Sequence, residues 1–236
     1  MTNHIKAVLF DLDDTLFDRT AAVERTLQHM ADEFPGLFSG ITIDKISHTF
    51  FRADDIATLE FNNGLSLKDT RLFRDREFLK SLGLDQSHAP AIDAFYIKYY
   101  PTNKVFVAGA KPIIERLARA YRLGLISNGN AIDQCQKLDN LGIRHLLSCT
   151  MLSEEIGIRK PDPRIFQEAA KNLGSSTDEC LFIGDSYEND VIGARNAGMQ
   201  ACWFNPGHIS PPQTTVIPNN FEISSLDQLF GILDYD

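Results

Sequence analysis

The chain has 236 residues, of which 43% are hydrophobic and 23% are charged, and its 32 acidic side chains against 23 basic ones leave a formal net charge of −9. This composition is typical of a folded globular protein and excludes the disordered and fibrous classes. An acidic surface repels the phosphates of nucleic acids and of anionic lipids, so we expect neither kind of partner. The sequence shows no membrane-length apolar run and no signal-peptide pattern, which predicts a cytoplasmic location.

Short apolar runs predict the strands of a buried sheet. The runs are continuous rather than alternating, as is typical of strands that helices cover on both faces, and this favours a mostly parallel sheet. They lie at residues 7–10, 123–126, 146–149, 181–183 and 201–204.

Helical patterns separate these runs. Apolar residues recur at helical spacing from Ile132 to Leu141, with Gly142 as a natural end. Asp162 followed by Pro163 predicts the start of another helix, which Gly174 ends, and a further helix is expected after Ser186. The alternation of strands and helices predicts an α/β fold of the doubly wound, Rossmann-like type.

One long segment interrupts the alternation. More than 100 residues separate the first two runs, and they are mostly helical by pattern, with a capping box at 66–69. We expect a core domain formed by residues 1–16 and 102–236, and an inserted helical domain formed by residues 17–101. After Pro206 the sequence predicts surface chain that ends in a short helix at 226–233.

Polar residues cluster where the predicted strands end. In an open parallel sheet, reactive side chains belong at the carboxyl ends of the strands, near the point where the strand order reverses. The residues placed there by the sequence are Asp11, Asp13, Ser127, Asn128, Lys160, Asp185 and Asp190.

Asp11 and Asp13 lie two residues apart after the first strand, so both can face one pocket, where their charges repel. A Mg²⁺ ion relieves such repulsion, and one carboxylate can then attack phosphorus while the other moves a proton. Lys160 and Ser127 can stabilise a phosphate group. The alternatives are that Asp13 only caps the following helix, that 127–129 is a simple turn and that Lys160 is a solvated lysine.

Four motifs in this order resemble those of the haloacid dehalogenase-like hydrolases. They are Asp-Leu-Asp-Asp-Thr-Leu at 11–16, Ser-Asn-Gly at 127–129, Lys-Pro-Asp-Pro at 160–163 and Gly-Asp-Ser-x-x-Asn-Asp at 184–190. The resemblance covers essentially the whole chain, and it implies that the inserted helices form the α-helical cap of this family.

The resemblance also implies roles for these residues. Asp11 would be the nucleophile that forms an aspartyl-phosphate, and Asp13 the general acid and base. Lys160 would stabilise the phosphorylated state, and Ser127 and Asn128 would bind phosphate. Asp185 would hold Mg²⁺ together with Asp11, the backbone carbonyl of Asp13 and, further out, Asp190. Dehalogenases of the family lack an aspartate at the position of Asp13, so its presence favours a phosphatase.

We therefore expect a Mg²⁺-dependent phosphatase that acts on a small soluble phosphorylated metabolite, first of all a nucleoside 5′-monophosphate, as a monomer or homodimer. The alternatives are a phosphoglycolate or sugar phosphatase, a phosphomutase, a receiver-like module and a non-catalytic binding protein. Basic and aromatic residues of the insertion, Arg74 and Phe50 among them, are candidates for substrate contacts, although most such residues are expected to be solvated or packed in the interior.

Overall fold

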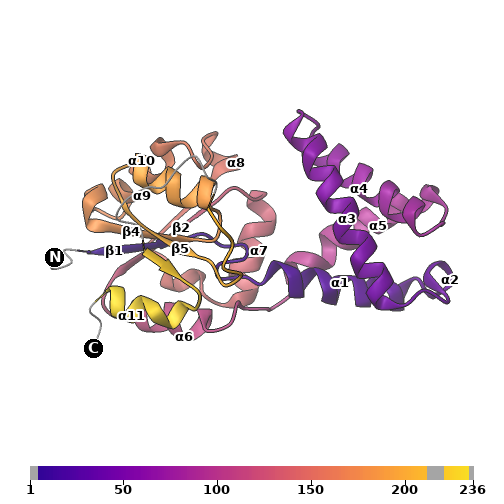
Figure 1. Cartoon of the computed structure of the whole chain (residues 1–236), viewed down its shortest axis with the longest axis horizontal. Helices are drawn as coiled ribbons and strands as arrows, with labels where there is room; N and C mark the ends of the chain where they lie inside the picture. Colours follow the sequence, from indigo (N-terminus) through magenta and orange to yellow (C-terminus); the bar gives the residue numbers. More distant parts are fainter. Residues whose placement is uncertain (1–4, 212–220, 234–236) are drawn as a thin grey trace. The chain divides into compact units, whose positions relative to one another are not determined.

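The computed structural model of the protein describes residues 5–211 and 221–233. The chain forms two compact units, one made of Met1–Arg19 with Lys104–Asp236 and the other of Thr20–Asn103 (Figure 1). Each unit has its own buried core.

The first unit is built on a six-stranded sheet in which all neighbouring strands are parallel. Its order, β3-β2-β1-β4-β5-β6, places β1 at the centre, with Phe10 opposite both Leu125 of β2 and Ile183 of β4. The doubly wound, mostly parallel sheet predicted from the sequence is confirmed. The strands are β1 (Ala7–Phe10), β2 (Arg122–Ser127), β3 (Cys149–Leu152), β4 (Cys180–Gly184), β5 (Gln200–Phe204) and β6 (Phe221–Ile223).

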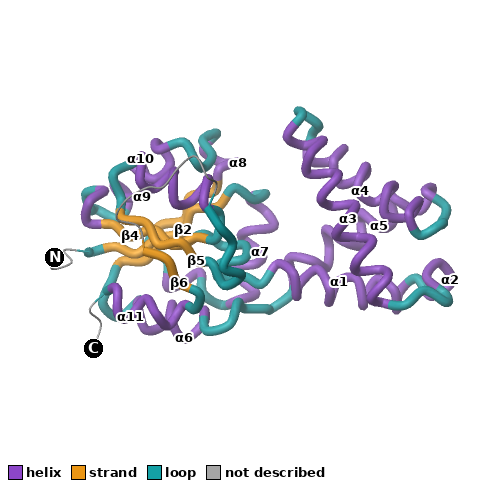
Figure 2. Tube along the Cα trace, viewed as in Figure 1, coloured by secondary structure: helices purple, strands orange, loops and turns teal. Residues whose placement is uncertain are grey.

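Helices cover both faces of this sheet, as Figures 1 and 2 show. Helices α9 and α10 lie on one face and α6 and α11 on the other. Phe166 of α9 packs edge-on against Phe182 of β4, with ring centroids 5.0 Å apart, in the core under the first pair. The helices of this unit are α6 (Ala110–Leu117), α7 (Ala131–Leu141), α8 (Ser153–Ile156), α9 (Pro163–Asn172), α10 (Gly193–Asn196) and α11 (Leu229–Ile232).

The best-marked helix of the sequence, α9, begins and ends as predicted. The side chain of Asp162 accepts a hydrogen bond from the backbone N–H of Arg164, and Pro163 occupies the first turn, where its missing N–H costs nothing. Gly174 follows the helix with a φ of 61°, a left-handed conformation that glycine adopts without steric cost.

Two expectations about strands were wrong. The third strand begins at Cys149 and not at Leu146, because residues 144–146 form a 3-10 turn. The chain after Pro206 is not all surface chain, since Phe221–Ile223 adds a sixth strand and Ile223 is buried. Residues 212–220 of that segment lie outside the described residues, and the short terminal helix is present as a 3-10 turn at Leu226–Gln228 followed by α11.

The second unit is helical: α1 (Arg19–Glu33), α2 (Pro35–Phe38), α3 (Ile43–Asn62), α4 (Leu67–Ser81) and α5 (Ala89–Tyr99). Helix α4 starts as its capping sequence predicts, because the Ser66 side chain accepts from the N–H of Asp69. Phe50 and Arg74, both candidates for substrate contacts, are buried instead in the interior of this unit, where the Arg74 guanidinium lies 4.6 Å from the Phe50 ring. Across residues 5–211 and 221–233, no helix is both long and apolar enough to cross a membrane.

Candidate active site

The candidate site lies at the carboxyl ends of the central strands. Strands β1 and β4 are neighbours although most of the chain separates them in sequence, so the strand order reverses between them. The N–H of Asp11 continues the sheet by donating to the carbonyl of Ile183 at 2.9 Å. Asp11 therefore comes to lie beside the loop that follows β4, at the position where open α/β sheets bind ligands.

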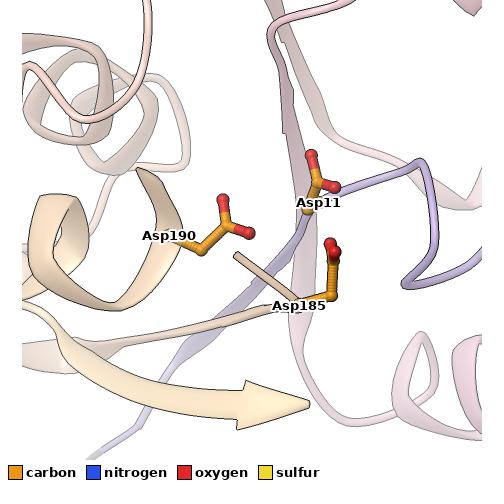
Figure 3. A group of neighbouring side chains, drawn as sticks. All are labelled: Asp11, Asp185 and Asp190. Carbon is orange, nitrogen blue, oxygen red and sulfur yellow. The ribbon is translucent and has the colours of Figure 1, made fainter. Parts of the chain in front are cut away.

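Three carboxylates converge there (Figure 3). One oxygen from each of Asp11, Asp185 and Asp190 lies within 4.8 Å of the others. Asp190 reaches the group from the turn that follows β4, and its Oδ2 accepts from the N–H of Ser186 at 2.9 Å. Asp11 and Asp190 are buried, so water screens their mutual repulsion poorly.

Lys160 neutralises part of this charge. Its Nζ donates to Asp11 Oδ1 at 2.5 Å and to Asp190 Oδ1 at 2.6 Å, and the side chain is 3% exposed. Burial acts to lower the pKa of Lys160, but the charges of Asp11 and Asp190 outweigh it and raise the pKa above its usual value. The lysine is thus held as a cation against the predicted nucleophile, and it is not a solvated surface lysine.

Burial and the remaining negative charge also raise the pKa values of two carboxyl groups, Asp185 and Asp11. Burial, reinforced by the charge of Asp190, raises the pKa of Asp185 to about 7. Burial also raises the pKa of Asp11, which the charge of Lys160 offsets only in part. Three carboxylates against one ammonium group leave a formal surplus of two negative charges, which a divalent cation would balance. The donor set is all oxygen and suits Mg²⁺.

Asp13 does not join this group through its carboxylate. Its Oδ1 accepts from Lys137 Nζ and its Oδ2 from Gln134 Nε2, both at 2.6 Å. Burial acts to raise the pKa of Asp13, but the charge and hydrogen bond of Lys137 hold it below its usual value. That the backbone carbonyl of Asp13 contacts a metal stays a prediction.

The residues after β2 have distinct positions. Ser127 Oγ accepts from Gln134 Nε2 at 2.8 Å and from the N–H of Gly129 at 3.2 Å. Because a hydroxyl has two lone pairs and one hydrogen, the hydrogen remains to donate to a ligand. The amide of Asn128 pairs with the backbone of Lys160 through two hydrogen bonds of 2.9 Å, so its side chain fixes the lysine segment. This pair uses one of the two hydrogens of the amide nitrogen, so the other hydrogen and the backbone N–H of Asn128 are the donors that a phosphate can use.

All seven residues selected from the sequence line a single cavity of about 190 Å³. They are Asp11, Asp13, Ser127, Asn128, Lys160, Asp185 and Asp190. The volume has room for a small anionic group and its hydration, and the lining offers both cationic and hydrogen-bonding contacts.

The sequence pattern did not single out Gln134 and Lys137, and the buried face that it predicts for α7 is correct at Leu138 and Leu141 but wrong at Ile132. Ile132, expected to be buried, is 69% exposed, whereas Gln134 and Lys137 are 1% and 3% exposed. Their spacing of three residues on a helix directly after the Ser-Asn-Gly turn was the available signal. Trp203 was also missed as a contact of the site: its indole N–H donates to the backbone carbonyl of Asp185 at 2.8 Å.

A comparison with protein families matches residues 5–198 to the model described as haloacid dehalogenase-like hydrolase. The chain belongs to this family. The resemblance inferred from the four motifs is confirmed, and with it the expectation of a hydrolase.

Some known proteins are similar to nearly the whole length of this chain, and others to about half of it. The glyceraldehyde 3-phosphate phosphatase of Methanopyrus kandleri is 28% identical over 239 residues, which cover 97% of each chain. The pyrimidine 5′-nucleotidase YjjG of Escherichia coli is 32% identical over 126 residues, covering 53% of this chain and 55% of that protein. Among solved structures, the magnesium-bound HAD-hydrolase YfnB of Bacillus subtilis has a TM-score of 0.82 at 25% identity, covering 98% of this chain and 99% of that one.

Proposed function

We propose that the protein is a Mg²⁺-dependent phosphatase that hydrolyses a small soluble phosphomonoester through an aspartyl-phosphate. The observation that carries the proposal is the buried contact of Lys160 with Asp11, 2.5 Å long, at the edge of a cavity that also receives Asp185 and Asp190. A carboxylate beside a fixed cation can approach a phosphate, whose negative charge would otherwise repel it.

The residues divide the reaction between them. Asp13 first takes up a proton from water. A carboxylate oxygen of Asp11 then attacks phosphorus and the bond from phosphorus to the substrate oxygen breaks, while Asp13 gives its proton to that oxygen. Water then attacks the phosphorus of the aspartyl-phosphate, Asp13 takes back a proton, and inorganic phosphate leaves with Asp11 restored. Lys160, the hydroxyl of Ser127 and the N–H of Asn128 stabilise the charge on the phosphoryl oxygens.

The metal fits the same cavity. Asp11, Asp185 and Asp190 are the carboxylates that would hold it, and bound Mg²⁺ would supply the positive charge that lets the carboxylates and a phosphate share the site. A magnesium-bound relative of the same fold supports this assignment.

We propose a nucleoside 5′-monophosphate as the first candidate substrate and a three-carbon sugar phosphate as the second. The relative named as a nucleotidase matches about half of the chain, whereas the one named as a glyceraldehyde 3-phosphate phosphatase matches nearly all of it. The helical unit, Thr20–Asn103, is proposed as the cap that selects between such substrates.

The test is phosphate release by the purified full chain from nucleoside monophosphates, triose and hexose phosphates and phosphoglycolate, with Mg²⁺ or with EDTA. We expect metal-dependent release that the Asp11→Asn variant lacks and that a matched variant at the exposed Asp178, Asp178→Asn, retains. Release that persists in Asp11→Asn would overturn the covalent route. Conversion of a hexose phosphate to its isomer without net release would indicate a phosphomutase.

A further inference from the structure

Helix α7 buries two strongly polar side chains on the face that packs toward the site. Gln134 is 1% exposed and Lys137 is 3% exposed. Burial of an amide and of an ammonium group costs free energy unless both form hydrogen bonds or ion pairs. The groups that these two side chains contact should therefore explain why they are buried.

Both side chains contact Asp13, one on each carboxylate oxygen. Lys137 Nζ donates to Oδ1 and Gln134 Nε2 donates to Oδ2, each at 2.6 Å. Two donors on different oxygens restrict the rotation of the carboxylate about its last bond more strongly than a single donor would. The same Gln134 nitrogen donates to Ser127 Oγ at 2.8 Å, so one amide connects the two loops.

The turn before α7 leaves room for this arrangement. A Cβ atom at Gly129 would lie 1.9 Å from Gln134 Nε2, a distance that no side chain allows. The absence of a side chain at Gly129 therefore lets the Gln134 amide pass beneath the turn to reach Asp13.

We infer that Gln134 and Lys137 are positioning residues that orient the carboxyl group of Asp13 for proton transfer. The inference rests on the proposed function, in which Asp13 gives a proton to the leaving oxygen and takes one from water. Such a transfer requires the carboxyl group to be within hydrogen-bond reach and correctly turned, and a freely rotating group meets that condition for only part of the time. A purely structural alternative is that the two residues only anchor α7.

The two explanations differ in how the rate depends on the leaving group. A good leaving group departs without a proton, whereas a basic one needs it. We would measure kcat/KM for a series of substituted phenyl phosphates, from 4-nitrophenyl to 4-methylphenyl phosphate, with Mg²⁺. The variants are Lys137→Met and Gln134→Met, which keep the side-chain length but remove the donors.

In the wild-type enzyme, kcat/KM is expected to depend weakly on the basicity of the leaving group. In both variants the dependence should steepen, with a loss of about 100-fold for 4-methylphenyl phosphate and less than about tenfold for 4-nitrophenyl phosphate, since positioned acid catalysis contributes factors of this order. Lys137→Arg keeps the cationic donor and should recover part of the loss.

Matched controls are Gln136→Met on the exposed side of α7 and Lys171→Met on α9, whose side chain is 77% exposed. Neither should change the dependence. Circular dichroism shows whether each variant folds. If Lys137→Met does not fold, the leaving-group dependence of Gln134→Met and Lys137→Arg distinguishes the positioning role from the structural one.

Equal losses for all leaving groups, no loss, or a gain in rate would each overturn the positioning role. Failure of the proposed function is seen separately and earlier: the wild-type enzyme would then release phosphate from none of these compounds nor from the metabolite panel, and the inference would fall with it.

Discussion

Lys160 compensates the charge of two carboxylates of this site. It is the cation that contacts both Asp11 and Asp190, and all three side chains are buried. Removal of one partner from a buried ion pair leaves the other charge without compensation, which is more damaging than the absence of the pair altogether.

We therefore expect Lys160→Met to lower the free energy of unfolding in EDTA by about 3 to 5 kcal/mol and to reduce kcat by at least about 100-fold in Mg²⁺. Thermal unfolding and steady-state kinetics measure the two effects, with Lys171→Met as the control. Mg²⁺ should restore part of the stability, because it supplies charge to the same carboxylates. Wild-type stability and rate in Lys160→Met would contradict the assignment.

Trp203 offers a signal for metal binding that does not depend on turnover. It is the one tryptophan of the sequence, its indole donates to the carbonyl of Asp185, and its ring lies 4.9 Å from that of Tyr187. Mg²⁺ should therefore change the tryptophan fluorescence in a saturable way that EDTA reverses. We expect Asp185→Asn to weaken the apparent affinity at least about tenfold, as loss of a carboxylate ligand lowers the charge of the site. An identical titration in the variant would place the metal elsewhere.

At the scale of an element, the turn after β4 depends on a close approach of backbone and side chain. The segment Tyr187–Ile192 forms a π-helical turn, which brings Asp190 back over the end of the strand. A Cβ atom at Gly184 would lie 2.2 Å from Asp190 Oδ2, so only glycine fits while Asp190 keeps its contact with Lys160.

Gly184→Ala should thus displace Asp190, lower the free energy of unfolding by about 1 to 3 kcal/mol, as overpacking typically does, and reduce kcat by more than about tenfold. Chemical denaturation and phosphate release measure these effects. Gly231→Ala is the control, because nothing lies within 4 Å of a Cβ atom there. If Gly184→Ala keeps wild-type stability and rate, the turn has room that the structure does not show.

At the scale of the whole molecule, the two units rest on different cores, and that of the helical unit contains charge. Arg74 lies against the rings of Phe50 and Tyr96 and donates to Asp75 Oδ1 at 2.9 Å. Asp75 is fully buried, and its Oδ2 is without a hydrogen-bond partner. Burial outweighs the charge of Arg74 and raises the pKa of Asp75 from 3.8 to about 6.

This shift predicts a pH dependence of stability. Between pH 4 and 6 the folded chain keeps a proton on Asp75 that the unfolded chain has lost, so stability falls as the pH rises through this window and levels off above it. The contribution is up to about 3 kcal/mol, at 1.36 kcal/mol for each pKa unit. Chemical denaturation at a series of pH values should show this fall in the wild type and less of it in Asp75→Asn, with the exposed Asp55→Asn as control. An unchanged pH profile in Asp75→Asn would refute the prediction.

The sequence by itself determined the class of fold and most of the site. Continuous apolar runs were sufficient for four of the strands, and the capping residues Ser66 and Asp162 marked two helix starts, because these signals depend only on neighbours in the chain. Asp11, Lys160, Asp185 and Asp190 could be grouped in advance, since the carboxyl ends of parallel strands share one edge of the sheet.

Only the tertiary structure decided features that depend on contacts between distant segments. The start of β3 at Cys149 and the existence of β6 follow from pairing with β2 and β5, and the local pattern does not reveal such pairing. The buried face of α7 was predicted only in part for the same reason. The apolar spacing placed Leu138 and Leu141 inside correctly but Ile132 wrongly. Asp13, more than 100 residues earlier, accepts the hydrogen bonds that make burial of Gln134 and Lys137 favourable. Burial of a polar side chain is favourable only where a hydrogen-bond partner is present, and the tertiary fold determines where that partner lies.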